Sequence, residues 1–223
     1  MISIKNLCFS YTKNQELLNN INLEIPDGIY LSILGENGSC KSTLIKLILG
    51  LLKPCSGSIS ISSNKISYVP QRLDNFNPDF PITVKEVLST HAKAVGIKNS
   101  KSIRESLNKV NMKDFEKSLI GNLSGGQQQR IFIARALIGN PDLIILDEPS
   151  TGVDEKSQNE IYPILQNLNK DFGKTIISVE HNTKVALKYS THILKIQDGT
   201  LTLYTKSEFI KYLKDEESIS NIG

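Results

Sequence analysis

The most informative stretch of this chain is residues 123–130, Leu-Ser-Gly-Gly-Gln-Gln-Gln-Arg. It follows a glycine-bearing loop at residues 35–43, Gly-Glu-Asn-Gly-Ser-Cys-Lys-Ser-Thr, and precedes an apolar run that ends in Asp147 and Glu148. Many nucleotide-binding proteins have a glycine-bearing loop. The run at 123–130, placed before the acidic pair, therefore distinguishes among classes of nucleotide-binding protein better than the loop does.

The glycine-bearing loop lies between a predicted strand and a predicted helix. Residues 29–34 form a short apolar run typical of a buried strand, and apolar residues recur at helical spacing over residues 41–52. A phosphate-binding loop requires this context, because N–H groups at the helix start point at the anion. Lys41 is placed to reach the β- and γ-phosphates of a nucleotide, and the Ser42 hydroxyl is placed to bind Mg²⁺.

The run at 123–130 predicts a second helix start. Ser124 is a favourable N-cap, and Asn140-Pro141 ends the helix that follows. The N–H groups of Gly125 and Gly126, together with the Ser124 hydroxyl, form a second candidate anion site. Taken alone, this stretch is equally consistent with an ordinary capped helix. The chain thus has two candidate phosphate sites for one acidic pair.

The remaining elements follow from periodicity and turn signals. The predicted strands are residues 2–9, 20–25, 59–61, 66–69, 143–146, 175–179, 193–196 and 201–204. The predicted helices are residues 83–138, interrupted near 96–101 and 118–125, then 155–171, and a short surface helix at 206–214. Strands and helices of this order predict a mixed α/β core in two sequence pieces, with a helical insertion between them.

These motifs and their spacing resemble the nucleotide-binding subunit of ATP-binding-cassette (ABC) transporters over most of the chain. The resemblance implies an α/β fold, namely a P-loop nucleotide-binding domain with a mixed sheet core, an antiparallel β part and an inserted helical subdomain. The predicted boundaries are a single ABC ATPase domain over 1–205, with its core at 1–71 and 141–205 and its helical subdomain at 72–140, followed by a short C-terminal helix and tail at 206–223.

The resemblance also implies a role for each motif residue. The implied ATP-binding residues are Tyr11, Gly35, Glu36, Asn37, Gly38, Ser39, Cys40, Lys41, Ser42, Thr43 and Gln71. The implied catalytic residues are Lys41, Glu148 as general base and His181, and the implied Mg²⁺ ligands are Ser42, Gln71 and Asp147. The implied contacts with a second subunit are the signature residues Ser124, Gly125, Gly126 and Gln127, which act on the ATP of that subunit, and Asp154 in the dimer loop.

Several of these residues have an ordinary structural alternative. Tyr11 is expected to stack on adenine, but a half-buried strand tyrosine has the same pattern. His181 is expected to contact the γ-phosphate, although an isolated histidine is more often structural. Two adjacent acids after four aliphatic residues suit a site for Mg²⁺ and a water, and a solvated turn is the alternative. Gln71 alone would indicate little. Its position directly before the turn-rich connector at residues 72–82 favours the role of a Mg²⁺ ligand.

Cys40 departs from the phosphate-loop pattern, which has glycine immediately before the lysine. If φ is negative at this position, cysteine costs little. Because every other catalytic position that the resemblance implies is present, we expect the chain to bind and hydrolyse ATP. If the position needs a positive φ, a residue other than glycine costs on the order of 1–2 kcal/mol. A thiol at a helix start beside Lys41 is also expected to have a lowered pKa and to be open to oxidation. The sequence leaves Cys40 neutral, impairing or redox-regulatory.

Composition limits the classes of partner. The chain has 223 residues with 26 basic and 23 acidic side chains, and this mild, evenly spread charge argues against nucleic acid. Its 3 cysteines form no Cys-x-x-Cys pair, which fits a reducing cytosol. The start of the sequence lacks a signal-peptide pattern, and no stretch approaches the ~18–20 apolar residues that cross a bilayer. A transporter containing this chain is therefore expected to take its membrane path from another chain.

The resemblance extends to partners and cargo. It implies a homodimer with two ATP molecules between head-to-tail subunits, at the cytoplasmic face of the cell membrane. A permease subunit is expected to contact residues 72–90, although a plain surface loop is the alternative. Residues 68–72, 80–87 and 151–158 resemble the cassette of zinc and manganese importers, which also implies an extracytoplasmic metal-binding protein. Another cargo, or a soluble ABC ATPase, stays open at this point.

Overall fold

The computed structural model of the chain describes residues 2–12, 16–71, 80–197 and 199–220. By compactness the chain divides into two units. Unit 1 comprises Met1–Asn64 and Thr175–Gly223, and unit 2 comprises Lys65–Lys174. The predicted helical subdomain at residues 72–140 was defined by its place in the sequence and not by compactness. The division into two units therefore does not test its boundaries, and they stay a prediction.

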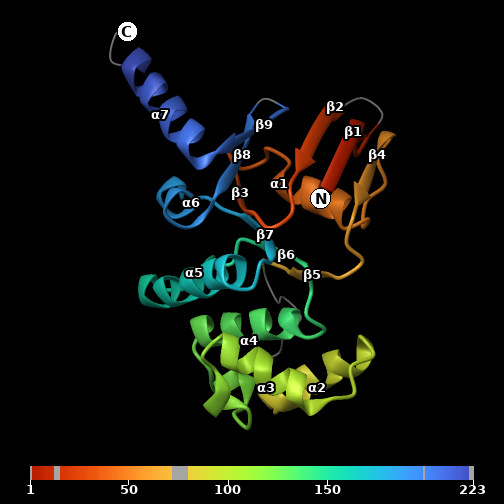
Figure 1. Ribbon diagram of the computed structural model, residues 1–223, viewed down its shortest axis with the longest axis vertical. Helices are drawn as coiled ribbons and strands as arrows, with labels where there is room; N and C mark the ends of the chain where they lie inside the picture. Colours follow the sequence, from red (N-terminus) through yellow and green to blue (C-terminus); the bar gives the residue numbers. More distant parts are fainter. Residues whose placement is uncertain (1, 13–15, 72–79, 198, 221–223) are drawn as a thin grey trace. The chain divides into compact units, whose positions relative to one another are not determined.

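Unit 1 contains two sheets and three helices among its described residues. Its strands are β1 (Ile2–Ser10), β2 (Glu16–Ile25), β3 (Tyr30–Gly35), β4 (Ser56–Ile61), β7 (Thr175–Val179), β8 (His192–Gln197) and β9 (Thr200–Thr205). Its helices are α1 (Lys41–Ile48), α6 (Thr183–Tyr189) and α7 (Lys206–Ser220). Strands β2, β1 and β4 form an antiparallel sheet, seen beside α1 in Figure 1. The second sheet is mixed, because β8 is parallel to β3 and antiparallel to β9.

Strand β1 lies between β2 and β4 in the antiparallel sheet. Ile2 pairs with Ile25 on one side and Ile61 on the other, and Ile4 pairs with Leu23. Ile2 and Ile4 lie on the same face of the strand and are almost fully buried, and Ser3 between them is buried too.

Strand β3 lies between two parallel neighbours and leads into the phosphate loop. Leu31 pairs with Ile177 of β7 and with His192 of β8. Every residue from Tyr30 to Leu34 is buried, as expected for a strand covered on both faces. The loop that follows therefore starts from a rigid position.

Helix α1 is shorter than predicted. Residues 41–52 were expected to be helical, but α1 ends at Ile48. Gly50 has φ +69°, and the N–H of Leu51 donates to the Lys46 carbonyl at 2.8 Å. This left-handed glycine reverses the chain and closes the helix end. As a result, Leu51 is 65% exposed and does not lie on the buried face of α1.

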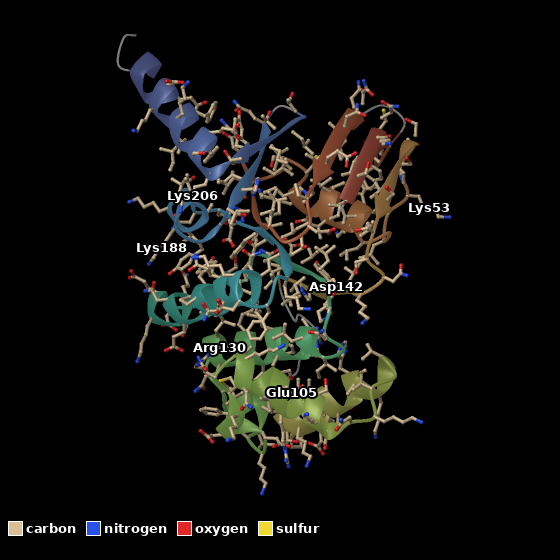
Figure 2. The ribbon with its side chains drawn as sticks, in the orientation of Figure 1. Lys53, Glu105, Arg130, Asp142, Lys188 and Lys206 are labelled. Atoms are coloured by element: carbon tan, nitrogen blue, oxygen red, sulfur yellow. The ribbon has the colours of Figure 1, made fainter. Side chains whose placement is uncertain are left out.

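Two other segments of unit 1 differ from prediction. Helix α6 was not predicted, because its seven residues are too few to establish a helical period. Asn182 caps it, accepting hydrogen bonds from the N–H groups of Lys184 and Val185. Helix α7 is longer than the predicted 206–214 and extends away from β9 in Figure 1. The labelled Lys53, Lys188 and Lys206 lie on different segments of unit 1 in Figure 2.

Unit 2 combines two parallel strands with helices. Its elements are β5 (Ile66–Val69), β6 (Leu143–Asp147), α2 (Val84–Ala94), α3 (Ser100–Lys109), α4 (Gly125–Leu137), α5 (Glu155–Lys170) and the short 3₁₀ helices η1 (Lys113–Phe115) and η2 (Ile120–Asn122). Helix α4 contacts α5 on one side and α2 and α3 on the other (Figure 1). Strand β6 is buried throughout and ends at Asp147. The predicted α/β fold with mixed and antiparallel sheets is confirmed. Among the described residues, none of the helices is long and apolar enough to span a bilayer.

Candidate functional site

The phosphate loop joins β3 to α1 and folds around the lysine. The ammonium of Lys41 donates to the carbonyls of Gly35 and Glu36, each at 2.8 Å. Gly38 has φ +84°, a backbone conformation that a side chain would strain. These contacts curl the loop around a buried cation at the start of a helix. Such a loop suits the phosphate groups of a nucleotide.

Close packing explains the first glycine of the loop. A Cβ atom on Gly35 would lie 2.4 Å from Ser39 Oγ and 2.7 Å from the Ile196 carbonyl. Among the described residues, the buried Ser39 hydroxyl has no hydrogen-bond partner. This hydroxyl can donate a hydrogen bond, so it is available to a ligand that accepts one, such as a phosphate oxygen.

Cys40 has φ +70° and ψ +18°, the left-handed conformation. The structure thus answers the question that the sequence left open, since this position has a positive φ and the cysteine side chain is strained there. The thiol makes no capping hydrogen bond to α1. Burial raises the pKa of the Cys40 thiol, so the expectation of a lowered pKa was wrong. The ammonium of Lys41 is hydrogen-bonded to the loop carbonyls of Gly35 and Glu36.

Tyr11 lies beside the phosphate loop on the β1 side. Its hydroxyl is 3.1 Å from Thr43 Oγ1 in the first turn of α1, and its ring packs edge-on against Phe9 with centroids 4.9 Å apart. The tyrosine is 58% exposed, so it is not the half-buried strand residue of the alternative interpretation. An exposed ring fixed at one edge and at its hydroxyl can stack on a planar base.

His181 lies on the same cavity as the phosphate loop. This cavity, of about 1060 Å³, is lined by loop residues 35–40, by Glu180 and His181 after β7, and by residues of β8 and α7. Glu180 is buried and His181 is exposed. Unit 1 therefore places His181 on the cavity of the phosphate loop, and it places Tyr11 against Thr43 in the helix turn that follows the loop.

The acidic pair of unit 2 occupies the end of β6. Asp147 is buried and accepts a hydrogen bond from the Tyr68 hydroxyl at 3.4 Å. Burial and the neighbouring carboxylate raise the pKa of Tyr68 to about 12. Glu148 Oε2 accepts hydrogen bonds from Gln71 Nε2 at 2.5 Å and from Thr151 Oγ1 at 2.8 Å. Unit 2 thus brings Gln71 to the acidic pair.

Carboxylate and amide oxygens are ligands that Mg²⁺ prefers. Asp147 and Gln71 offer such oxygens in unit 2, and Ser42, in the first turn of α1, offers a hydroxyl in unit 1. The chemistry of the three predicted ligands therefore fits Mg²⁺.

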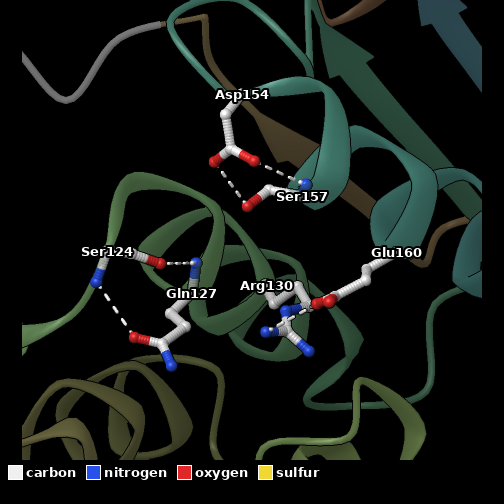
Figure 3. Close-up of polar contacts among 6 residues, drawn as sticks. All are labelled: Ser124, Gln127, Arg130, Asp154, Ser157 and Glu160. Carbon is white, nitrogen blue, oxygen red and sulfur yellow. Dashed lines mark hydrogen bonds and ion pairs between the residues drawn. The ribbon is translucent and has the colours of Figure 1, made fainter.

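The signature residues begin α4. Ser124 Oγ accepts from the N–H of Gln127 at 3.3 Å, and Gln127 Oε1 accepts from the N–H of Ser124 at 2.9 Å (Figure 3). This reciprocal capping box leaves the start of α4 well defined. A Cβ atom on Gly126 would lie 2.3 Å from Ser157 Oγ, so the glycine lets α4 lie directly against α5.

The predicted dimer-loop residue begins α5. Asp154 accepts hydrogen bonds from the N–H and the hydroxyl of Ser157 at 3.0 and 2.7 Å, which lower the pKa of its carboxyl (Figure 3). Arg130 of α4 and Glu160 of α5 form an ion pair of 3.0 Å in the same view. The signature start and the dimer-loop start are therefore neighbouring, mutually braced helix ends within unit 2.

Sequence reasoning missed the residues that support this arrangement. Gln128 Nε2 donates to the carbonyls of Ile120 and Leu123 before α4, and Gln158 Nε2 donates to the carbonyls of Ser150 and Val153 before α5. Each glutamine follows its N-cap, Ser124 or Asp154, by four residues. That shared spacing was the available signal.

The predicted permease-contact region lies only partly within the described residues. Residues 72–79 of the predicted 72–90 lie outside them. Phe80 is 59% exposed, and Thr83 and Glu86 form a capping box that begins α2. An exposed aromatic residue next to a fixed helix start is compatible with a contact surface.

Known proteins match the chain along most of its length. A family model described as ABC transporter matches residues 18–151. A Treponema pallidum protein named "Probable metal transport system ATP-binding protein" is 40% identical and covers 96% of this chain and 90% of its own. The zinc uptake system ATP-binding protein ZurA of Listeria monocytogenes is 37% identical over 97% of this chain and 90% of its own. The manganese transport system ATP-binding protein MntB of Bacillus subtilis is 39% identical, and the match covers 86% of this chain and 82% of MntB.

Solved structures share the fold. The protein cbiO1 from Clostridium perfringens, described as part of the ABC transporter complex cbiONQ, has a TM-score of 0.84 at 27% identity and covers 98% of this chain and 93% of its own. A dimeric ATP-binding cassette, MJ0796, bound to ADP and Pi in a post-hydrolysis state, has a TM-score of 0.76 at 30% identity. The match covers 92% of this chain and 99% of MJ0796.

Proposed function

This chain belongs to the ABC transporter family, and from that membership we propose that it is the ATP-hydrolysing subunit of a transporter that imports zinc or manganese. The observation that carries the ATPase part is the phosphate loop, which holds the Lys41 ammonium against two of its own carbonyls. The phosphates of ATP replace those carbonyls as partners of Lys41. The cargo part is supported by relatives named for metal, zinc and manganese transport, each at least 37% identical.

We assign the residues of unit 1 to binding. The ring of Tyr11 stacks on the adenine, the loop N–H groups surround the phosphates, and Lys41 offsets their charge. His181, from the same cavity as the loop, contacts the γ-phosphate. The residues that would bind Mg²⁺ are Ser42 of this unit and, from unit 2, Gln71 and Asp147. The metal would neutralise charge that develops on the phosphate oxygens.

We assign the acidic pair of unit 2 to hydrolysis. Glu148 accepts a proton from the attacking water or orients that water toward the γ-phosphate. Its carboxylate already accepts two hydrogen bonds in the structure, so its direction is defined before ATP binds. Asp147 is next to it and is buried, which suits a metal ligand and not a proton carrier.

We propose that two copies of the chain close on two ATP molecules. The support within this chain is that the start of α4 and the start of α5 are braced together, by Gly126 against Ser157 and by Arg130 with Glu160. Residues 124–127 of one copy then contact ATP held by the other copy, and Asp154 lies at the junction. The dimeric relative bound to ADP and Pi has a TM-score of 0.76, which supports this arrangement.

The transporter also needs other chains. We propose a permease that contacts residues 72–90, an extracytoplasmic metal-binding protein, and a place for this chain at the cytoplasmic face of the membrane. The test is affinity purification of the chain from detergent-solubilised membranes, followed by an ATPase assay. An integral membrane protein that co-purifies and alters the ATPase rate is the expected result. ATPase activity that is stimulated by ribosomes or DNA, without a membrane partner, contradicts the transporter proposal.

A further inference from the structure

Glu148 has a backbone conformation that glutamate rarely adopts. Its φ is +51°, in the left-handed region, and its peptide follows the last residue of β6. For a residue other than glycine, this conformation costs about 1–2 kcal/mol and persists only where the surroundings impose it. The described contacts of Glu148 include two donors to its carboxylate and a hydrogen bond within the turn that follows.

One oxygen of the carboxylate receives two donors. Gln71 Nε2 lies 2.5 Å from Glu148 Oε2, and Thr151 Oγ1 lies 2.8 Å from the same atom. Hydrogen bonds to a charged acceptor are shorter and stronger than neutral ones. Gln71 is a predicted Mg²⁺ ligand. Thr151 lies in the stretch 151–158 that resembles metal importers, but the sequence analysis gave its side chain no role in hydrolysis.

The turn that follows Glu148 fixes the Thr151 side chain. The N–H of Thr151 donates to the Glu148 carbonyl at 3.1 Å, so the two residues are joined by backbone as well as by side chain. Threonine is stiff about χ1, because two heavy atoms on Cβ leave few rotamers. A threonine hydroxyl in this turn can therefore hold a carboxylate in one direction more firmly than a longer side chain.

Helix α5 holds the same turn from the other side. Gln158 Nε2 donates to the Val153 carbonyl at 2.9 Å and to the Ser150 carbonyl at 3.4 Å. The N–H of Val153 also donates to the Ser150 carbonyl at 3.2 Å. Residues 150–153 are thus attached to the first turn of α5, which begins at the predicted dimer-loop residue Asp154.

We propose that Thr151 is a positioning residue for ATP hydrolysis, which holds the Glu148 carboxylate in the direction that the attacking water requires. The proposal rests on the proposed function, because it needs Glu148 to act on that water. We assign Thr151 no direct contact with ATP. It acts by removing alternative rotamers of Glu148 before the nucleotide binds.

The test compares Thr151→Val and Thr151→Ser in purified protein. Valine keeps the shape of threonine and loses the hydroxyl, and we expect kcat to fall about tenfold, since one hydrogen bond to a charged group is lost. The Kd for ATP, measured with a fluorescent nucleotide, stays unchanged. Thr151→Ser restores the hydroxyl and keeps kcat within about twofold of wild type. Thr202→Val, at an exposed threonine of β9, is the matched control and leaves both constants unchanged.

A double-mutant comparison separates positioning from a structural effect. In the Glu148→Gln background, Thr151→Val is expected to lower the residual rate no further, because the carboxylate that it positions is gone. Thr151→Ala serves as a second hydroxyl-free variant with the same expectation, and thermal unfolding checks that each variant is folded. An equal fall in both backgrounds, or a wild-type kcat in Thr151→Val and Thr151→Ala, overturns the positioning role.

The same variants distinguish this inference from the proposed function. If Glu148→Gln hydrolyses ATP at the wild-type rate, the assignment of Glu148 fails and the role of Thr151 fails with it. If Glu148→Gln is inactive while Thr151→Val matches wild type, only the positioning inference fails.

Discussion

Gly126 and Ser157 lie so close that a Cβ atom on the glycine would be 2.3 Å from both the Cβ and the Oγ of the serine. The start of α4 therefore lies directly against the start of α5. Because Ser124 and Asp154 cap these two helices, the predicted signature and dimer-loop residues are placed relative to each other by one glycine.

Gly126→Ala is predicted to force these two helix starts apart. We expect a loss of about 1–3 kcal/mol in the free energy of unfolding, as for other overpacked positions. Urea unfolding measures the change. Gly125→Ala is the matched control, since its Cβ would meet the Gly152 carbonyl at an ordinary 3.6 Å. The control is expected to be neutral or stabilising, because alanine has the better helix propensity. Equal destabilisation by the two substitutions contradicts the packing argument.

Cys40→Gly is predicted to stabilise the protein by about 1 kcal/mol, because glycine adopts a positive φ without strain. Cys40→Ala keeps the Cβ atom, so it is expected to bring no comparable gain. Thermal unfolding of the three proteins provides the comparison. A gain in Cys40→Ala equal to that in Cys40→Gly assigns the effect to the thiol and not to the backbone.

Glu160→Gln is predicted to lower stability by about 1 kcal/mol, since it leaves the mostly buried Arg130 guanidinium without its carboxylate. Glu105→Gln removes an exposed pair with Lys101 at the i,i+4 spacing, and is expected to cost only about 0.3–0.5 kcal/mol. Figure 2 labels Arg130 and Glu105. Urea unfolding at low and high salt tests the difference. An equal response at both sites refutes a special role for the Arg130–Glu160 pair.

Ionisation of Tyr68 is predicted to lower the free energy of unfolding at alkaline pH. Its folded-state pKa of about 12 exceeds the ordinary value, so the folded protein retains this proton longer than the unfolded chain. The stabilisation is fully present below pH ~10 and decreases as pH rises from about 10 to about 12.

Tyr68→Phe is the variant that tests this dependence, because it removes the titrating hydroxyl. We expect a shallower alkaline loss of stability and the disappearance of one tyrosinate absorbance step near pH 12. The raised pKa of the buried Tyr30 contributes to both proteins and cancels in the difference. Superimposable pH curves for the two proteins contradict the predicted shift.

The sequence predicted the motifs well because each depends on local geometry. Strand β3, the phosphate loop and the start of α1 follow each other directly, so their order along the chain is enough to predict that they are neighbours in space. The same holds for β6 and the acidic pair. Periodicity placed most of the other strands and helices. The α/β fold and the family that the resemblance of the motifs implied are confirmed.

The sequence failed where a single backbone angle or a distant contact decides the outcome. The left-handed Gly50 ends α1 early, which apolar spacing through Leu51 concealed. The φ of Cys40 was left open, because cysteine at a position normally held by glycine shows no conformation of its own. The contact of Thr151 with Glu148 depends on how a turn folds back on β6, and no residue pattern around Thr151 indicated it. For Gln158, the spacing from its N-cap was a signal that was not used. The functional roles of the site residues remain predictions.

Cellular metal content is the most direct measure of ATP-driven metal import by this chain and its partners. Zinc, manganese and iron are measured under metal limitation in a deletion strain that carries wild-type protein or Glu148→Gln. We predict a selective loss of zinc or manganese, restored by wild type and not by Glu148→Gln. Unchanged zinc and manganese in the deletion strain, or full restoration by Glu148→Gln, would contradict ATP-driven metal import by this chain.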